Sequence, residues 1–434
     1  MRVRLKTNRI TMAKSHLFIS ITALFVAGLS TLPSRASTPT LEELWALVQT
    51  QQAEINALKA QVEQQQLELS ERALEVAEVK TENEAQSMQL EATLDYLETS
   101  PLEQGTPAVS IGGYGELHYN NLDSGNEIDY HRFVLYFGHA FTENLSFYSE
   151  LELEHALAGD GAPGEIELEQ AFVQWDFSPS HRARAGMMLV PVGFLNETHE
   201  PDTFYGVERN SIEKNVIPTT WWEAGASLSG EVTSTLKYDF MLHSGLALDL
   251  DHPSAKKQTN IRSARQKVSE ATAEALAYSG RLEWQPNASL KIGGTVQYQA
   301  DLTQGAGAGG AKDIDGLLIE SHLEAFAGPF SLRALYARWD LDDAIAVINA
   351  GSEKQLGWYV EPRYRISDRL GLFARYGEFD LQAGQNTMDS QNETIDVGLN
   401  YWIHETVVIK ADIQRYRFAG ETNRGFNIGV GYSF

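Results

Sequence analysis

The last nine residues of the chain, 426–434, alternate between large apolar side chains and small or polar ones, and the final residue is aromatic. One face of this segment carries Phe426, Ile428, Val430, Tyr432 and Phe434, and the other carries only Asn427, Gly429, Gly431 and Ser433. Because successive side chains of a strand point to opposite faces, the pattern predicts a strand with hydrocarbon on one side and a wet interior on the other. Such a strand is typical of the closing strand of a transmembrane β-barrel.

Residues 1–36 predict a secretory signal peptide. Basic residues lead, an apolar run follows at 17–29, and the small residues Ser34 and Ala36 stand where cleavage requires them. The apolar run has about 13 residues and a membrane-spanning helix needs roughly 20, which makes a single membrane anchor the weaker interpretation. We therefore expect an exported chain that begins near Ser37 and reaches the outer membrane of a Gram-negative cell.

Residues 37–100 predict an α-helical coiled-coil stalk. A seven-residue step from Leu41 to Leu97 meets an apolar residue at eight of nine positions, and the exception is Asn83. This repeat of about 3.5 residues is the pattern of a coiled-coil seam. The second seam is half polar, so a single solvated helix is an alternative. A linker with proline and glycine at 101–108 separates the stalk from the rest of the chain.

Residues 109–434 contain sixteen alternating stretches and predict an antiparallel transmembrane β-barrel of sixteen strands. The stretches 166–177 and 330–339 do not alternate cleanly. Short turns alternate with longer connections, which we expect at 120–129, 158–165, 191–221, 246–275, 300–314, 340–354, 380–391 and 418–423. Short periplasmic turns and long external loops are the asymmetry of outer-membrane barrels, which favours this fold over a soluble β-sandwich or propeller. With both barrel ends on the short-turn side, the stalk is expected in the periplasm.

Several short segments of the barrel region form motifs: QAFVQW at 170–175, AG at 185–186, PVGF at 191–194, VER at 207–209 and GASLSG at 225–230. On these segments the chain resembles the phosphate-selective porin O and P family. The resemblance implies a sixteen-stranded, trimeric outer-membrane porin in which Tyr432 and Phe434 look like the signal read by the barrel-assembly machinery. It does not imply phosphate specificity, because the family's phosphate-coordinating lysines and arginines do not match this chain position by position.

Charge bears on which solutes such a pore would pass. The chain has a formal net charge of -25, and the barrel region alone holds 25 basic and 45 acidic residues. Selectivity, however, is set by the few charges at the narrowest point, and two loops are candidates for that constriction. The loop at 191–221 supplies Glu197, His199, Glu200, Glu208 and Arg209, and the loop at 246–275 supplies Arg262, Arg265 and Lys267. For the second loop, contact with anionic lipopolysaccharide is the alternative interpretation.

Further charged residues fall on the predicted inward faces of strands, because a lipid-facing Lys or Arg costs about 2–4 kcal/mol at the bilayer midplane. They are Glu150, Glu152, Glu154, Lys237, Lys291, Glu320, Glu324 and Lys410. Their mixed signs predict a general pore with a mild cation preference. We expect a homotrimeric diffusion channel for small polar or charged solutes, anions such as phosphate included. A structural tether that contacts the cell wall through the stalk, and a ligand-specific channel for a chelate or sugar, are the alternatives.

The sequence gives little support for a disulfide scaffold, a metal site or an enzyme. The chain has no cysteine, which excludes disulfide scaffolds and zinc sites built on thiolates. Glu197, His199 and Glu200 have no spacing that suits a compact metal site, and no serine motif provides a nucleophile with its base. We therefore predict no catalytic residue, no metal, no cofactor and no nucleic-acid partner, and we expect contact with outer-membrane lipid and lipopolysaccharide.

Overall fold

The computed structural model describes residues 109–306, 313–342, 344–384, 390–418 and 420–434, and five helical, exposed residues near the N-terminus: Trp45, Gln49, Gln52, Asn56 and Lys59. The chain divides into two units, Met1–Gln104 and Gly105–Phe434. The predicted signal peptide, nearly all of the predicted stalk and the linker at 101–108 lie outside the described residues. The coiled coil and the domain bounds therefore stay predictions.

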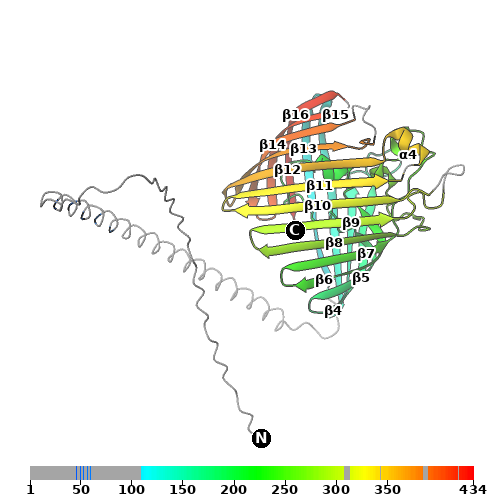
Figure 1. The fold of residues 1–434 in the computed structure, drawn as a ribbon, viewed down its shortest axis with the longest axis horizontal. Coiled ribbons are helices and arrows are strands. Elements are labelled where there is room, and N and C mark those ends of the chain that lie inside the picture. The colour runs from blue at the N-terminus through cyan, green and yellow to red at the C-terminus, as the bar shows by residue number, and fades with distance from the viewer. Residues whose placement is uncertain are drawn as a thin grey trace, which may run out of the picture. The chain divides into compact units, whose positions relative to one another are not determined.

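Sixteen strands form one closed antiparallel barrel, in which each strand pairs with its neighbours in sequence and β1 pairs with β16 (Figure 1). This confirms the predicted sixteen-stranded barrel. The strands are β1 Val109–Leu122, β2 Gly125–Thr142, β3 Leu145–Glu154, β4 Ile166–Ser178, β5 His181–Leu189, β6 Trp222–Thr233, β7 Leu236–His243, β8 Ala277–Asn287, β9 Leu290–Gln299, β10 Gly316–Ala327, β11 Phe330–Leu341, β12 Lys354–Ser367, β13 Leu370–Asp380, β14 Asn392–His404, β15 Val407–Phe418 and β16 Glu421–Ser433.

Four short helices lie in the connections. They are α2 Ser211–Asn215, α3 Ala255–Gln258, the 3-10 helix η1 Ile261–Ala264, and α4 Ile345–Ala350. Within the part of the chain that the structure describes, no helix has the length and apolarity needed to cross a membrane.

The last strand closes the barrel by pairing with the first. The amide of Gly113 donates to the carbonyl of Phe434 at 2.9 Å, and the amide of Phe434 donates back at 2.8 Å. Phe426, Ile428 and Val430 are 38–44% exposed on the outer face, as the alternation in this segment predicts. The residues of β16 therefore present an apolar surface to lipid.

The connections differ between the two ends of the barrel. At one end, the turn end, every connection between consecutive strands has two residues; at the other, the loop end, long connections occur at 155–165, 190–221, 244–276, 300–315, 342–353 and 381–391. The predicted long loops at 120–129 and 418–423 are wrong. There the pairing of β1 with β2 continues as far as Leu122 and Gly125, and the pairing of β15 with β16 continues as far as Phe418 and Glu421. Their polar side chains suit strands that extend beyond hydrocarbon into water.

Aromatic side chains form an outward belt near the turn end. Trp175, Phe177, Trp284, Phe330 and Tyr364 are 38–59% exposed and all lie within a few residues of a turn. Girdles of this kind mark the interface between hydrocarbon and headgroups in outer-membrane barrels. The belt therefore fixes the depth of the turn end in the membrane.

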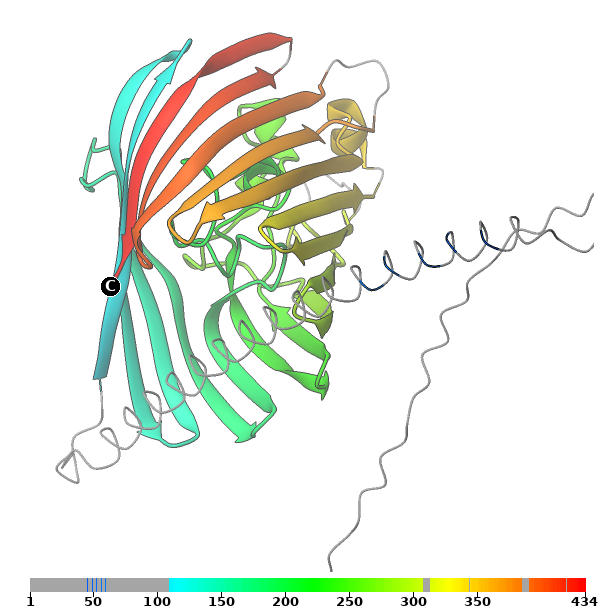
Figure 2. The ribbon, with the colours of Figure 1, turned by 90° about the vertical axis from the view of Figure 1, so that its left-hand side faces the viewer.

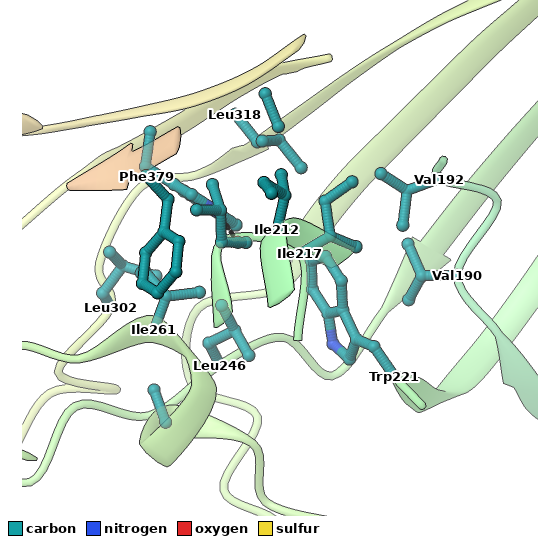
Figure 3. Packing of buried hydrophobic residues seen from close by; sticks show 14 of the residues in the cluster. Val190, Val192, Ile212, Ile217, Trp221, Leu246, Ile261, Leu302, Leu318 and Phe379 are labelled. Carbon is teal, nitrogen blue, oxygen red and sulfur yellow. Dashed lines mark hydrogen bonds between the residues drawn. The ribbon is translucent and has the colours of Figure 1, made fainter. Parts of the chain in front are cut away.

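Three of the loop-end connections fold into the barrel and build an apolar core there. Figure 2 shows these green segments inside the ring of strands, and Figure 3 shows their packing. The loop at 190–221, called the internal loop below, contributes Ile212, Ile217 and Trp221, each fully buried. Most other members come from the two later connections and from the inner faces of β10 to β13, and include Leu246, Ile261, Leu302, Leu318, Leu335, Trp339, Tyr359 and Phe379; a few, such as Phe172 of β4 and Met241 of β7, come from other strands. This side of the barrel is therefore packed with protein, and we call it the filled half.

The small residues of the last strand make room for the internal loop. A Cβ atom at Gly429 would lie 2.9 Å from Cγ1 of Val207, and one at Gly431 would lie 2.4 Å from Cβ of Pro201. Beside these two glycines the internal loop fills the interior, whereas the expected wet interior is kept farther along the strand, where Asn423 lines a cavity. Glycine is present at these two positions because the internal loop packs directly on the strand.

Polar groups hold the internal loop in shape. Asn196 donates to the carbonyl oxygens of Val190 and Trp221 and accepts from the amide of Trp221, which joins both ends of the loop. The buried carboxylate of Glu213 accepts from the amides of Phe194 and Leu195, at 2.9 and 2.6 Å, and from the hydroxyl of Tyr359. The loop thus has a fixed conformation supported from the barrel wall.

A β-bulge explains why 166–177 does not alternate cleanly. Glu150 pairs with Gln170 and the next residue, Leu151, pairs with Leu168, so Glu169 is an extra residue in β4. An extra residue reverses the alternation, and both Glu169 and Gln170 therefore point inward.

Candidate functional site

A cavity with a volume of about 360 Å³ lies between strands β2 to β4 and the inward-folded loops, toward the loop end. We call it the outer cavity. The acidic wall of this cavity comes from β3, β4 and the residue before β4, and consists of Glu152, Glu154, Glu165, Glu167 and Glu169. These acids follow one another at every second position, because alternate residues of a strand share a face.

The opposite wall of the outer cavity is basic and belongs to the folded loops. It consists of Arg209, Lys214, Arg262, Arg265 and Lys267. Arg262 donates to the carbonyl oxygens of Lys214 and Thr219, at 2.6 and 2.9 Å, and Arg265 donates to that of Thr220. The two arginines therefore fasten the connection 244–276 to the end of the internal loop.

Most of these cations have no carboxylate partner. Among the described residues, Arg209, Lys214, Arg262 and Arg265 form no ion pair within 4.0 Å, whereas Lys267 pairs with Glu165 at 2.8 Å and with Glu167. Nε and Nη2 of Arg209 and Nε1 of Trp222 are buried donors without a hydrogen-bond partner. The basic wall thus presents unused positive charge and N–H groups to the cavity.

Burial acts on the pKa values of two cations of the basic wall, Arg262 and Lys267. Burial, and then the charge of Arg265, lower the pKa of Arg262 to about 10. Burial of Lys267 would lower its pKa, but Glu165 and Glu167 raise it above the usual value. Arg262 and Lys267 are therefore expected to stay cationic at physiological pH.

Two further cavities adjoin the internal loop. One of about 440 Å³ shares Glu208, Arg209 and Lys214 with the outer cavity and extends along β13 to β16. The other, of about 670 Å³, lies toward the turn end, where Tyr148 and Gln170 are among its lining residues, and we call it the inner cavity. Solute space therefore exists on both sides of the internal loop.

Comparison with known proteins identifies the family. The profile of the phosphate-selective porin O and P family matches residues 109–414, which is most of the chain and nearly all of the barrel. The chain belongs to this family. An uncharacterized protein of Aquifex aeolicus (strain VF5) is 32% identical over 345 residues, which cover 73% of this porin and 77% of that protein.

Solved structures share the fold at low sequence identity. The anion-selective porin from Comamonas acidovorans is 12% identical with a TM-score of 0.53, and covers 76% of this chain and 100% of its own. OmpF of Salmonella typhi, in complex with daunomycin, is 11% identical with a TM-score of 0.54, over 75% of this chain and 97% of its own. Family and fold together make this porin a passive-diffusion channel of the outer membrane rather than an enzyme.

The predicted residues of the internal loop lie at separate places in the porin. Glu208 and Arg209 border the outer cavity, and Glu208 accepts hydrogen bonds at 3.0 Å from Asn120 and in its pair with His118. Glu197 forms an ion pair with Arg281 on β8 and lines the inner cavity. Glu200 accepts from the hydroxyl of Tyr136 at 3.3 Å, and His199 is buried between Glu150 and Glu169. The loop therefore contributes to three different sites.

The other charged strand residues are mostly paired. Lys237 lies 3.4 Å from Glu231, Lys291 2.6 Å from Glu283, Glu320 2.8 Å from His322, and Glu324 2.5 Å from Arg333. Lys410 is buried, with Nζ 3.6 Å from the ring centre of Phe204. Glu152 and Glu154 line the outer cavity. Of the predicted lumen-facing acids, only these two belong to its acidic wall.

Several residues of the outer cavity were not singled out from the sequence. They are Arg132, Glu165, Glu167, Glu169 and Trp222. The acidic wall could have been predicted from the acids at every second position from 165 to 169, because such spacing puts them on one face of a strand. No comparable signal exists for Arg132 and Trp222, whose place depends on how the loops fold.

Proposed function

We propose that the outer cavity is the selectivity constriction of this porin and that small anions, phosphate among them, pass along its basic wall. The supporting observation is the set of four cations without a carboxylate partner, Arg209, Lys214, Arg262 and Arg265. Fixed charges at a narrow, partly dry place act over a short distance and are weakly screened. They outweigh the acidic surplus of the barrel region as a whole.

The acidic wall is less available to permeating cations than its composition suggests. Lys267 pairs with both Glu165 and Glu167, which leaves these two carboxylates less free to attract a permeating cation. Opposed walls of opposite sign also create a transverse field, which orients polar solutes as they pass. This arrangement favours anions over the mild cation preference expected from the strand residues.

Reversal potentials of single channels in asymmetric KCl test the proposal. The wild type is expected to prefer chloride, and the double variant R262Q/R265Q is expected to shift toward potassium. The variant R262K/R265K keeps the charge and should keep the preference, and K237Q at the turn end should match the wild type. An unchanged reversal potential in folded R262Q/R265Q would contradict the proposal, and the absence of any conductance in the wild type would favour the tether.

We also propose a homotrimer with the stalk in the periplasm, on the strength of the family resemblance and the seven-residue repeat. Deletion of residues 41–100 should leave a folded barrel. Loss of the trimer on this deletion, measured by native gel and light scattering, would mean that the stalk drives assembly.

A further inference from the structure

Three side chains of the kind that bind metals meet beside the outer cavity, and one of them, Glu169, lines it. Glu150 of β3, Glu169 of β4 and His199 of the internal loop are 1%, 2% and 2% exposed. Nε2 of His199 lies 3.6 Å from Oε1 of Glu150 and 3.5 Å from Oε2 of Glu169. All three donor atoms lie within 4.8 Å of one another.

The three facing atoms make no hydrogen bond within the described part of the chain. Oε1 of Glu150, Oε2 of Glu169 and Nε2 of His199 are each buried without a partner. Buried polar atoms are nearly always paired, because an unpaired one costs about 1–3 kcal/mol. Three of them directed at one point indicate a common partner of positive charge.

Neighbouring groups orient these atoms toward one another. Nδ1 of His199 lies 3.2 Å from the carbonyl oxygen of Asn196, which only accepts, so Nδ1 carries the hydrogen. In the neutral ring, Nε2 then directs a lone pair at the two carboxylates. Gln170 donates to Oε2 of Glu150 at 2.6 Å, which leaves Oε1 of Glu150 for His199. Histidine ligands of metals are commonly held by a carbonyl in this way.

The separations suit a metal ion better than a shared proton. Both 3.5 and 3.6 Å exceed the range of about 2.7–3.2 Å in which N–H···O hydrogen bonds form. Ligands bound tetrahedrally to one zinc ion, at about 2.0–2.2 Å, lie about 3.3–3.6 Å from one another. Both distances from Nε2 of His199 fall within that interval, and the two carboxylate oxygens lie within 4.8 Å of each other.

The buried carboxylates around the site also favour a cation there. Glu116, Glu150, Glu152 and Glu169 are each at most 2% exposed, and the nearby buried arginine, Arg132, pairs with Glu116 at 2.5 Å. Buried carboxylates need a compensating charge. A divalent ion would supply it for Glu150 and Glu169.

We propose that Glu150, Glu169 and His199 bind one divalent transition-metal ion, for which one imidazole and two carboxylates are a suitable donor set. The β-bulge fits this arrangement, because it turns two neighbouring residues inward. They are Glu169, which is a ligand, and Gln170, which holds the ligand Glu150 in place. The site separates the outer cavity, lined by Glu152, from the inner cavity, lined by Tyr148. The ion would fasten the internal loop to β3 and β4 at this division.

A second group of potential ligands, Asp129, His131 and His155, does not carry the same inference. Nδ1 of His131 and Nδ1 of His155 lie 3.1 and 2.8 Å from the same oxygen of Asp129. Ordinary hydrogen bonds account for both distances, and none of these atoms is buried without a partner.

Metal content of the folded porin tests the proposal. Protein purified from outer membranes is stripped with EDTA, incubated with ZnCl2, freed of excess zinc and analysed by mass spectrometry. One zinc ion per chain is expected in the wild type, and none in E169Q or H199Q. H243Q is the matched control, because His243 is equally buried but bonds Ser279 at 2.9 Å and no carboxylate, and it should keep the ion. With CoCl2 the wild type should show the visible absorption of tetrahedral cobalt.

Removal of a ligand can prevent the barrel from folding, which heat-modifiable migration on gels would reveal. A milder variant is therefore tested as well. Q170A keeps all three ligands and loses only the hydrogen bond to Glu150, and it should bind zinc at least tenfold more weakly. Absence of zinc from the wild type would overturn the proposal in favour of a protonated His199. Full retention in folded E169Q and H199Q, unchanged affinity in Q170A, or loss of the ion in H131Q would overturn the assignment to this site.

Discussion

The filled half and the half that holds the outer cavity are built on opposite chemistry within one barrel. Beside β10 to β13, three connections bury apolar side chains such as Trp221 and Ile217 as a soluble protein would. Beside β2 to β4, charged walls face each other across about 360 Å³. The filled half therefore gives the outer cavity its shape, because it holds the loops that carry the basic wall.

The largest effect is expected when a large buried side chain is removed from the filled half. Trp221→Ala should destabilise the barrel by about 3–5 kcal/mol, because a fully buried indole leaves a large void. It should also widen the pore, since the loop loses its packing. Thermal unfolding and single-channel conductance measure the two effects. Trp284→Ala on the lipid-facing side is the control and should leave the conductance unchanged, and a wild-type conductance in Trp221→Ala would contradict the division of roles.

A smaller effect is expected from the polar support of the loop. The amides of Phe194 and Leu195 donate to one oxygen of Glu213, and the side-chain amide of Asn210 donates to the other. Glu213→Gln weakens these acceptors and turns an N–H group toward one set of donors, which should cost about 1–3 kcal/mol. Thermal unfolding gives this value, and exposed Glu231→Gln should show almost no change. Equal melting temperatures for the two variants would mean that apolar packing alone holds the loop.

The contact between the internal loop and the last strand predicts a position-specific effect. Gly429→Val should destabilise by about 1–3 kcal/mol, because its side chain would meet Val207. Gly280→Val is a matched strand control, since a Cβ there meets nothing within 4 Å. Resistance to unfolding at graded urea concentrations compares the two, and similar losses would argue against close packing of the loop on β16.

The smallest expected effect concerns pH. Burial of Glu208 would raise its pKa, but the hydrogen bond and charge of His118 lower it below the usual range. Glu208 therefore stabilises the folded state above the unfolded pKa of about 4.3, and this contribution disappears as the pH falls through the folded pKa. Glu208→Gln should melt below the wild type at pH 7, and the gap should narrow in acid. A gap that widens in acid would reverse the assigned sign, and Glu143→Gln at a turn serves as control.

Much of the barrel was predictable because period-two alternation is a local property of the sequence. The strand count and the alternation of connections followed from it. The connections 120–129 and 418–423 were misjudged, because polar residues such as Asn120 and Asn423 are tolerated in strands that rise above the membrane. The bulge at Glu169 was visible only as imperfect alternation, since nothing local says which residue is extra.

The site was less predictable than the fold. Sequence reasoning selected Arg209, Arg262 and Arg265, which do meet at one cavity. It grouped His199 with Glu197 and Glu200, its neighbours in sequence, whereas the nearest carboxylates are Glu150 and Glu169 on strands. Such partners depend on where the internal loop docks, and docking is decided by shape and packing across the whole barrel.

The contact of the internal loop with the last strand has a consequence for biogenesis. Pro201 packs on Gly431, and the hydroxyl of Ser433 donates to Asp202 at 2.8 Å, although more than 200 residues separate the partners. The loop is synthesised long before the strand on which it rests. A chain that lacks the last strand therefore offers this part of the loop neither Gly431 nor Ser433, so the strand that closes the wall also completes the support of the loop.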